Sequence, residues 1–142
     1  MISDIQILAR TIYGEARGEY NKSNGGIGAL IAIANVVMNR LKQKSWYGNT
    51  IREVCQKPWQ FSCWNDNDPN LCVLRAETII DPVFEICLQV SEKVIAGTWP
   101  DLTKGSDHYY ATSLKIPPRW ALGRLPKCQI GQHLFFDLRG GR

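Results

Sequence analysis

Residues 26–42 read GIGALIAIANVVMNRLK, and this stretch decides the fold. Its large apolar residues point in nearly every direction around a helix, with alanines between them. A helix that is apolar on all sides is buried inside its domain. The distance between packed helices depends on the side chains at their contact, so the small residues allow close neighbours. Residues 23–26 (SNGG) break the chain and can start a helix, so the sequence predicts a central helix that runs from this break to about Lys42.

Two further helices are predicted, one on each side of this central helix in the sequence. Ser3 or Asp4 can cap the first, whose apolar residues recur at helical spacing up to Ala16. Asp81 followed by Pro82 is typical of the start of a helix, and a buried stripe follows until glycine ends the pattern at position 97.

The remaining segments predict shorter elements. Residues 50–53 have the form of a capping box, which opens a short helix. Residues 59–64 are predicted to be extended, and residues 107–110 and 131–136 alternate as short strands do. The predicted fold class is therefore α+β and mostly helical, with a small antiparallel β element.

Length and composition indicate one globular domain over residues 1–142, with 44% hydrophobic and 21% charged residues. There is no apolar run of about 18 residues, so no membrane-spanning helix is expected. The net charge of +4 is spread without a basic block. It is compatible with attraction to an anionic polymer such as a cell wall, but it does not indicate nucleic-acid binding. We expect a monomer.

The cysteines and acidic residues predict no metal site. No pair of cysteines has the close spacing of a structural zinc site. Residues 66–77 resemble a calcium loop through Asp66, Asp68 and Asn70, but Leu71 stands where the turn requires glycine. We therefore expect no metal and no cofactor. An oxidising compartment would favour one or more disulfides, and the sequence leaves open whether they form among Cys55, Cys63, Cys72, Cys87 and Cys128.

Residues 13–19, YGEARGE, place two carboxylates near the end of the first helix. At about 100° per residue, Glu15 lies roughly 80° from the centre of the apolar stripe, at the border between core and solvent. Arg10 and Arg17 are predicted to lie on the far side. A carboxyl group with an apolar wall can remain protonated, as an acid catalyst must. The plainer interpretation is a solvated helix end, and Glu19, one turn later, shares the face of Glu15 if the helix continues.

Several segments, taken together and in order, resemble the SleB/CwlJ-type cell-wall hydrolases, whose first known members degrade spore cortex peptidoglycan. Each segment is short, but the ordered set is specific and spans nearly the whole chain, from Ile5 to Phe136. The segments are 9–19 (ARTIYGEARGE), 34–40 (ANVVMNR), 54–55 (VC), 60–62 (QFS), 105–110 (GSDHYY) and 130–136 (IGQHLFF).

The resemblance implies a lysozyme-like fold related to lytic transglycosylases, with Glu15 as the helix-borne catalytic acid. It also implies which side chains line the groove for peptidoglycan glycan strands: Gln60, Phe61, Ser62, Tyr109 and Tyr110. Since neighbouring residues of a strand point to opposite faces, one of the two tyrosines can face the groove and the other the core. His133 is expected to be a packing residue.

Glycosides are usually cleaved with two carboxyl groups, and the sequence offers no obvious partner for Glu15. A lytic transglycosylase needs only one, because the C6 hydroxyl of N-acetylmuramic acid closes onto C1 and gives a 1,6-anhydro sugar. A muramidase that uses water remains the alternative, with Glu19, Asp101 or Asp107 as base. An amidase that cuts the peptide stem is disfavoured, because this sequence lacks the usual zinc ligands of such enzymes. A peptidoglycan-binding module without catalysis is a further alternative from another class.

The tryptophans outside the predicted helices either cover the core or offer flat faces to sugar rings. They are Trp46, Trp59, Trp64, Trp99 and Trp120. The N-terminal residues lack the basic head and apolar stretch of a secretion signal. We therefore expect synthesis in the bacterial cytoplasm, unless a leader has been removed, and action on the wall in the periplasm or outside after release. A compact catalytic domain of this kind is similar to a phage endolysin.

Overall fold

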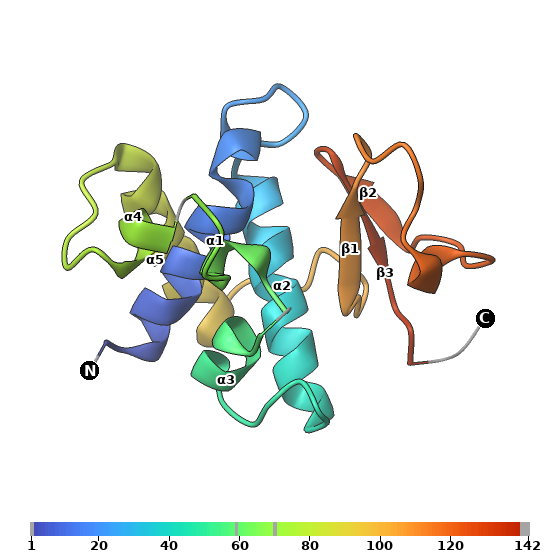
Figure 1. Cartoon of the computed structure of the whole chain (residues 1–142), viewed down its shortest axis with the longest axis horizontal. Helices are drawn as coiled ribbons and strands as arrows, with labels where there is room; N and C mark the ends of the chain where they lie inside the picture. Colours follow the sequence, from blue (N-terminus) through green and yellow to red (C-terminus); the bar gives the residue numbers. More distant parts are fainter. Residues whose placement is uncertain (1, 59, 70, 140–142) are drawn as a thin grey trace.

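A computed structural model describes residues 2–58, 60–69 and 71–139 of the chain (Figure 1). Trp59 and Asn70, each part of an expectation from the sequence, lie outside the described residues. Among the described residues, no helix combines the length and the apolar character needed to cross a membrane. Three long helices occupy one side of the molecule in Figure 1, and a small sheet stands beside them. The helices are α1 (Asp4–Tyr20), α2 (Gly26–Gln43) and α5 (Pro82–Ile95).

The core forms where α1, α2 and α5 pack against one another. Helix α2 is buried along most of its length, as its apolar sequence predicts. Both predicted caps are present. The Ser3 hydroxyl accepts a hydrogen bond from the backbone N–H of Gln6, and the Asp81 carboxylate accepts one from that of Val83. Asp81 also accepts a hydrogen bond from the Tyr13 hydroxyl at 2.6 Å, which joins the start of α5 to α1.

The predicted strands pair as a sheet with one strand more than the sequence indicates. Strands β1 (His108–Ala111), β2 (Cys128–Ile130) and β3 (His133–Phe136) are antiparallel in the order β1-β3-β2. Tyr109 lies opposite Phe135 in this register. Gly131 has a φ of +59°, a conformation suited to glycine, at the turn between β2 and β3. The mostly helical α+β class is confirmed.

The predicted short helix is α3 (Ile51–Gln56), where Thr50 caps the N–H of Glu53. The prediction of an extended segment before position 65 is wrong, because η1 (Ser62–Trp64) is a 3-10 turn. Helix α4 (Leu71–Arg75) and the 3-10 turn η2 (Arg119–Ala121) were not predicted. Both α4 and η2 are too short to show a hydrophobic period.

Arg10 does not lie on the solvent side as predicted, since its side chain is only 4% exposed. Its guanidinium donates to the backbone carbonyls of Leu74, at 2.8 Å, and of Ala76 and Glu77. These carbonyls end α4 and begin the next loop, where the helix leaves acceptors without intrahelical donors. Arg10 therefore attaches α4 to α1, although it lies outside the apolar stripe of α1.

Gly14 lets the chain after α3 approach α1 closely. A Cβ atom at this position would lie 2.7 Å from Cys63 Cβ and 2.9 Å from Leu74 Cδ1. At Gly18, four residues later on the same helix, a Cβ atom would meet nothing within 4 Å. Gly14 is therefore required by packing, whereas Gly18 has free space around it.

We predict opposite effects on stability for alanine at these two positions. Alanine favours the helix at both positions, so the difference in unfolding free energy between the two variants measures the crowding around Gly14. Gly18→Ala should raise the free energy of unfolding by up to about 1 kcal/mol. Gly14→Ala should lower it by about 1–3 kcal/mol, because Cys63 must move. Urea unfolding of both variants tests this, and equal stabilisation by both would show that the contact around Gly14 is not tight.

Candidate active site

Glu15 lies in the last third of α1, half-buried, with its carboxyl group between two donors from distant parts of the chain. The backbone N–H of Cys63 donates to Oε2 at 3.2 Å. The Tyr109 hydroxyl donates to Oε1. These contacts join α1 to η1 on one side and to β1 on the other. Glu15 is therefore held at the place where the helical part and the sheet meet.

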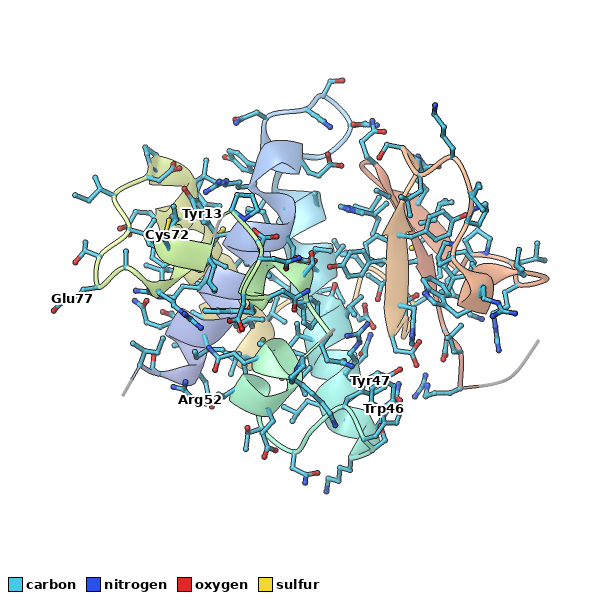
Figure 2. All side chains as sticks on the ribbon, viewed as in Figure 1. Tyr13, Trp46, Tyr47, Arg52, Cys72 and Glu77 are labelled. Atoms are coloured by element: carbon cyan, nitrogen blue, oxygen red, sulfur yellow. The ribbon has the colours of Figure 1, made fainter. Side chains whose placement is uncertain are left out.

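A cleft of about 460 Å³ opens at Glu15, and residues from the helices, the loops and the sheet line it. Among the described residues that line it, Glu15 alone carries a carboxyl group. Trp46, 62% exposed, lies on the loop after α2 (Figure 2), and its ring centre is 4.5 Å from that of Tyr47. The other lining residues are Arg40, Gln60, Ser62, Asn65, His108, Tyr109 and Trp120.

The structure brings four of the residues expected at the site together in this cleft, namely Glu15, Gln60, Ser62 and Tyr109. Phe61 does not line it, because its side chain is 1% exposed and belongs to the hydrophobic core. Tyr110 points to the other face of β1, where its ring stacks on Phe136.

Tyr109 is a half-buried hydrogen-bond donor to the candidate acid. Burial, together with the nearby Glu15 carboxylate, raises the pKa of the Tyr109 hydroxyl well above its ordinary value. The hydroxyl therefore keeps its proton and donates a hydrogen bond to Glu15 Oε1. The ring of His133 packs edge-on against that of Tyr109, at 5.1 Å between centres, and His133 is 8% exposed. Its burial agrees with the packing role expected for His133.

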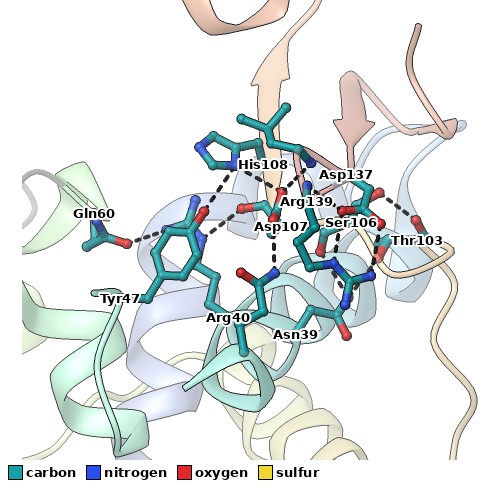
Figure 3. A network of polar contacts seen from close by, with 12 residues as sticks. Asn39, Arg40, Tyr47, Gln60, Thr103, Ser106, Asp107, His108, Asp137 and Arg139 are labelled. Atoms are coloured by element: carbon teal, nitrogen blue, oxygen red, sulfur yellow. Dashed lines mark hydrogen bonds and ion pairs between the residues drawn. The ribbon is translucent and has the colours of Figure 1, made fainter. Parts of the chain in front are cut away.

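Arg40 joins the two walls of the cleft (Figure 3). Its side chain is 6% exposed. Nε donates to the backbone carbonyl of Asp107 in the chain leading into β1, and Nη1 donates to Gln60 Oε1, both at 2.8 Å. The guanidinium also lies over the rings of Tyr47 and Phe61, 4.9 Å from each centre. Arg40 therefore fixes the Gln60 segment relative to the sheet.

Asp107 supports the neighbouring cleft residue His108. Burial opposes ionisation of its carboxyl group, but hydrogen bonds from His108 and Gln43 and from the backbone N–H of Leu138 outweigh it, and the pKa of Asp107 is lowered to about 2. His108 Nδ1 lies 3.1 Å from the carboxylate. When Nδ1 carries the proton, Nε2 is left as the acceptor nitrogen of the ring.

Glu19, the second carboxylate of YGEARGE, has a different environment. It is 7% exposed, accepts the backbone N–H of Gln132 at 2.6 Å and forms an ion pair with Lys22 at 3.0 Å. Burial opposes ionisation, but these partners outweigh it and lower the pKa of Glu19. Glu19 therefore attaches the turn between β2 and β3 to the end of α1.

The described residues show no metal-binding group. Within residues 2–58, 60–69 and 71–139, no three His, Cys, Asp or Glu side chains gather as metal ligands do. All five cysteines lie within these ranges and have free thiols, so the disulfides that the sequence left open are not formed.

The sequence model of the Cell Wall Hydrolase family matches residues 26–136, which is most of the chain and includes the cleft residues from Arg40 to Trp120. The chain belongs to this family. Glu15 precedes the matched range, and only the structure and the longer alignments below connect it with the rest of the site.

Members of this family with curated sequences include spore cortex-lytic enzymes. The chain is 29% identical over 135 residues to that of Bacillus subtilis strain 168, and the alignment covers 95% of this chain and 38% of the relative. It is 28% identical over 137 residues to that of Oceanobacillus iheyensis, covering 94% of this chain and 41% of the relative. The chain thus spans about two fifths of the length of the curated relatives it matches.

Solved catalytic domains of Cell Wall Hydrolase relatives have the same fold. The catalytic domain of the Bacillus cereus SleB protein matches with a TM-score of 0.66 and 25% identity, over 93% of this chain and 88% of that one. The catalytic domain of the germination-specific lytic transglycosylase SleB from Bacillus anthracis matches with a TM-score of 0.64 and 25% identity, over 93% and 92% of the two chains. The SleB-type, lysozyme-like α+β fold is thereby confirmed.

Sequence reasoning assigned no role to several residues of this cleft. Arg40 is part of a segment that carries the resemblance, and its signal was an arginine within a helix whose large residues are mostly apolar. A cation at such a position must be buried with partners. Asn65 and His108 carry no comparable signal, because only the folding of distant segments places them together.

We predict that the Asp107 carboxylate stabilises the fold in a pH-dependent way. Its folded pKa is below the ordinary value, so the stabilisation is present above about pH 4 and is lost as the pH falls through about 2. Asp107→Asn should therefore lower the free energy of unfolding by about 2 kcal/mol at pH 7. The difference from the unmodified protein should shrink between about pH 4 and pH 2.

Denaturant unfolding across this pH range checks the expectation. Asp66→Asn is the matched control, because the Asp66 side chain is 98% exposed and its ion pair with Arg75 is long, at 3.9 Å. Such exposed pairs contribute little. A destabilisation by Asp107→Asn that is the same at every pH would contradict the proposed linkage.

Proposed function

We propose that this protein degrades peptidoglycan by cleaving the bond between N-acetylmuramic acid and N-acetylglucosamine, as a lytic transglycosylase. The observation that carries the proposal is a single carboxyl group, Glu15, held by two donors in an open cleft with tryptophans on its walls. Flat aromatic faces and neutral polar groups are what sugar rings require of a binding cleft. The names of the relatives support the cell wall as the substrate, and one solved neighbour is named as a lytic transglycosylase.

Glu15 acts first as the general acid. Its proton passes to the oxygen that links the two sugars, the bond from that oxygen to C1 of the muramic acid breaks, and the ring carries positive charge. A glycan in the cleft excludes water from the carboxyl group, so the proton passes to the glycosidic oxygen and not to solvent. The carboxylate left behind accepts hydrogen bonds from Tyr109 and the N–H of Cys63, which stabilise it.

Glu15 then acts as the base. The carboxylate removes the proton of the muramic C6 hydroxyl while its oxygen bonds to C1, so the product is a 1,6-anhydro sugar and no water is consumed. The carboxyl group recovers the proton that it gave in the first step. One acid is enough for this cycle because the substrate supplies the attacking group.

The surroundings of the other carboxylates favour this route over hydrolysis by a muramidase. Glu19 is occupied by Lys22 and the N–H of Gln132. Asp101 accepts hydrogen bonds from Asn39 and from the backbone N–H of Thr103. Asp107 is 1% exposed. None of these three lines the described cleft, so none of them is placed there as a carboxylate base for an attacking water. The proposed site of action is the bacterial cell wall, after release of the enzyme from the cytoplasm.

We predict that Glu15→Gln abolishes lysis while leaving the fold intact. Glutamine keeps the shape of the side chain but cannot donate a proton from an acid, so the rate of turbidity loss of purified peptidoglycan should fall at least about a hundredfold. Glu85→Gln, on the exposed side of α5, is the control and should keep full activity. Comparable melting temperatures of the three proteins establish that folding is unchanged. Near-normal lysis by Glu15→Gln, or binding without lysis by the unmodified protein, would refute the catalytic proposal.

A second prediction concerns the product. Fragments released from a defined glycan should end in 1,6-anhydro-N-acetylmuramic acid, lighter by one water than a hydrolysed end, because the C6 oxygen replaces water. Mass spectrometry of a digest made in isotopically labelled water measures both the mass of the fragment ends and whether they contain oxygen from water. Label incorporated at the muramic C1 would assign the reaction to a muramidase instead.

A further inference from the structure

We propose that Gln60 donates a hydrogen bond to the acetamido carbonyl of an N-acetylated sugar in the cleft, and that Arg40 is the positioning residue that gives Gln60 this role. The inference rests on the proposed function, because it names the substrate group that the same cleft binds. The proposed catalytic steps leave the buried Arg40, a lining residue of the cleft, without a role.

The contact with Arg40 fixes which end of the Gln60 amide faces the cleft. A guanidinium group has five donor hydrogens and no acceptor, so its partner at 2.8 Å must be the amide oxygen of Gln60. Figure 3 shows Gln60 reaching Arg40 through this oxygen. The amide nitrogen, with two donor hydrogens, is then the end left for other partners. Since Gln60 lines the cleft, it offers the cleft a donor.

Arg40 itself has little freedom to release Gln60. Its Nε is bound to the Asp107 carbonyl, and the rings of Tyr47 and Phe61 lie against the guanidinium. A side chain that is 6% exposed and held on three sides does not change rotamer readily. The orientation of the Gln60 amide is therefore set before a ligand arrives, which lowers the entropic cost of binding.

An amide donor beside a buried cation selects for an acceptor. The sugar hydroxyls of a glycan both donate and accept, whereas the acetamido carbonyl only accepts. The charge of Arg40 polarises the Gln60 amide and strengthens its N–H groups as donors. It also favours the partial negative charge of a carbonyl oxygen nearby and disfavours an ammonium group. The cleft should therefore prefer N-acetylated over N-deacetylated glycan.

Gln60→Glu separates this role from simple support of Arg40. A glutamate keeps an oxygen at Arg40 and adds an ion pair to a buried cation, so the melting temperature should be equal or higher. Its second oxygen, however, has no hydrogen to donate to the cleft. A purely structural Gln60 would tolerate this change, and a donor to the acetyl group would not.

The experiment compares binding and cleavage of peptidoglycan before and after chemical N-deacetylation. Binding is measured by co-sedimentation in the Glu15→Gln background, so that it does not depend on catalysis, and cleavage in the active protein. The unmodified cleft should prefer the acetylated glycan about tenfold, the value of one well-placed hydrogen bond. Gln60→Glu should lose that preference or invert it, because its carboxylate attracts the glucosamine ammonium group.

Two further variants complete the test. Arg40→Lys keeps the charge but cannot hold both Gln60 and the Asp107 carbonyl in the same fork geometry, so it too should lose the acetyl preference. Ser62→Ala, at a neighbouring cleft position, should lower affinity for both glycans without changing their ratio. An unchanged ratio in Gln60→Glu would overturn the inference. Because the ratio is read from binding, failure of Glu15→Gln to abolish lysis would refute the catalytic proposal alone.

Discussion

The geometry of the whole cleft depends on the burial of the Arg40 charge. Removing a guanidinium from water is costly, and the cost is offset only when the surrounding groups are held in good geometry. Here those groups come from three separate segments: the Asp107 carbonyl, the Gln60 amide and the rings of Tyr47 and Phe61. A shift of the sheet away from α2 would remove the Asp107 carbonyl from Arg40 Nε. The charge therefore fixes the distance between the helical part and the sheet.

The environment of Glu15 follows from the same constraint. One of its donors, the N–H of Cys63, belongs to the segment that Phe61 and Gln60 anchor to Arg40. The other, the Tyr109 hydroxyl, belongs to the strand that begins beside Asp107. Neither donor is near Glu15 in the sequence, so both reach α1 only through the tertiary fold. The helix supplies the carboxyl group, and the buried arginine on the next helix determines what surrounds it.

The sequence predicted those parts of the fold that local patterns encode. Hydrophobic periodicity and caps gave α1, α2 and α5, and alternation gave the strands around Tyr109 and His133. It missed α4 and β2, which are short and form because of tertiary contacts such as those of Arg10. It also placed Arg10 in solvent, since periodicity describes a face and not the carbonyl groups that a distant loop presents to it. The cleft was predicted only in part for the same reason. Whether Phe61 faces the cleft or the core depends on how distant segments pack, and in the structure it faces the core.

The two carboxylates of YGEARGE show how position along one helix separates structure from chemistry. Glu19 forms an ion pair with a lysine and accepts a hydrogen bond from a backbone N–H. These contacts hold the turn between β2 and β3 and lower the pKa of Glu19. Glu15, one turn earlier, meets a hydroxyl and an N–H but keeps an open side toward the cleft. The first arrangement removes the obvious second carboxylate from the reaction. The nucleophile must then come either from water without a second carboxylate in the described cleft or from the substrate itself, and the C6 hydroxyl of muramic acid is already attached at the reacting ring.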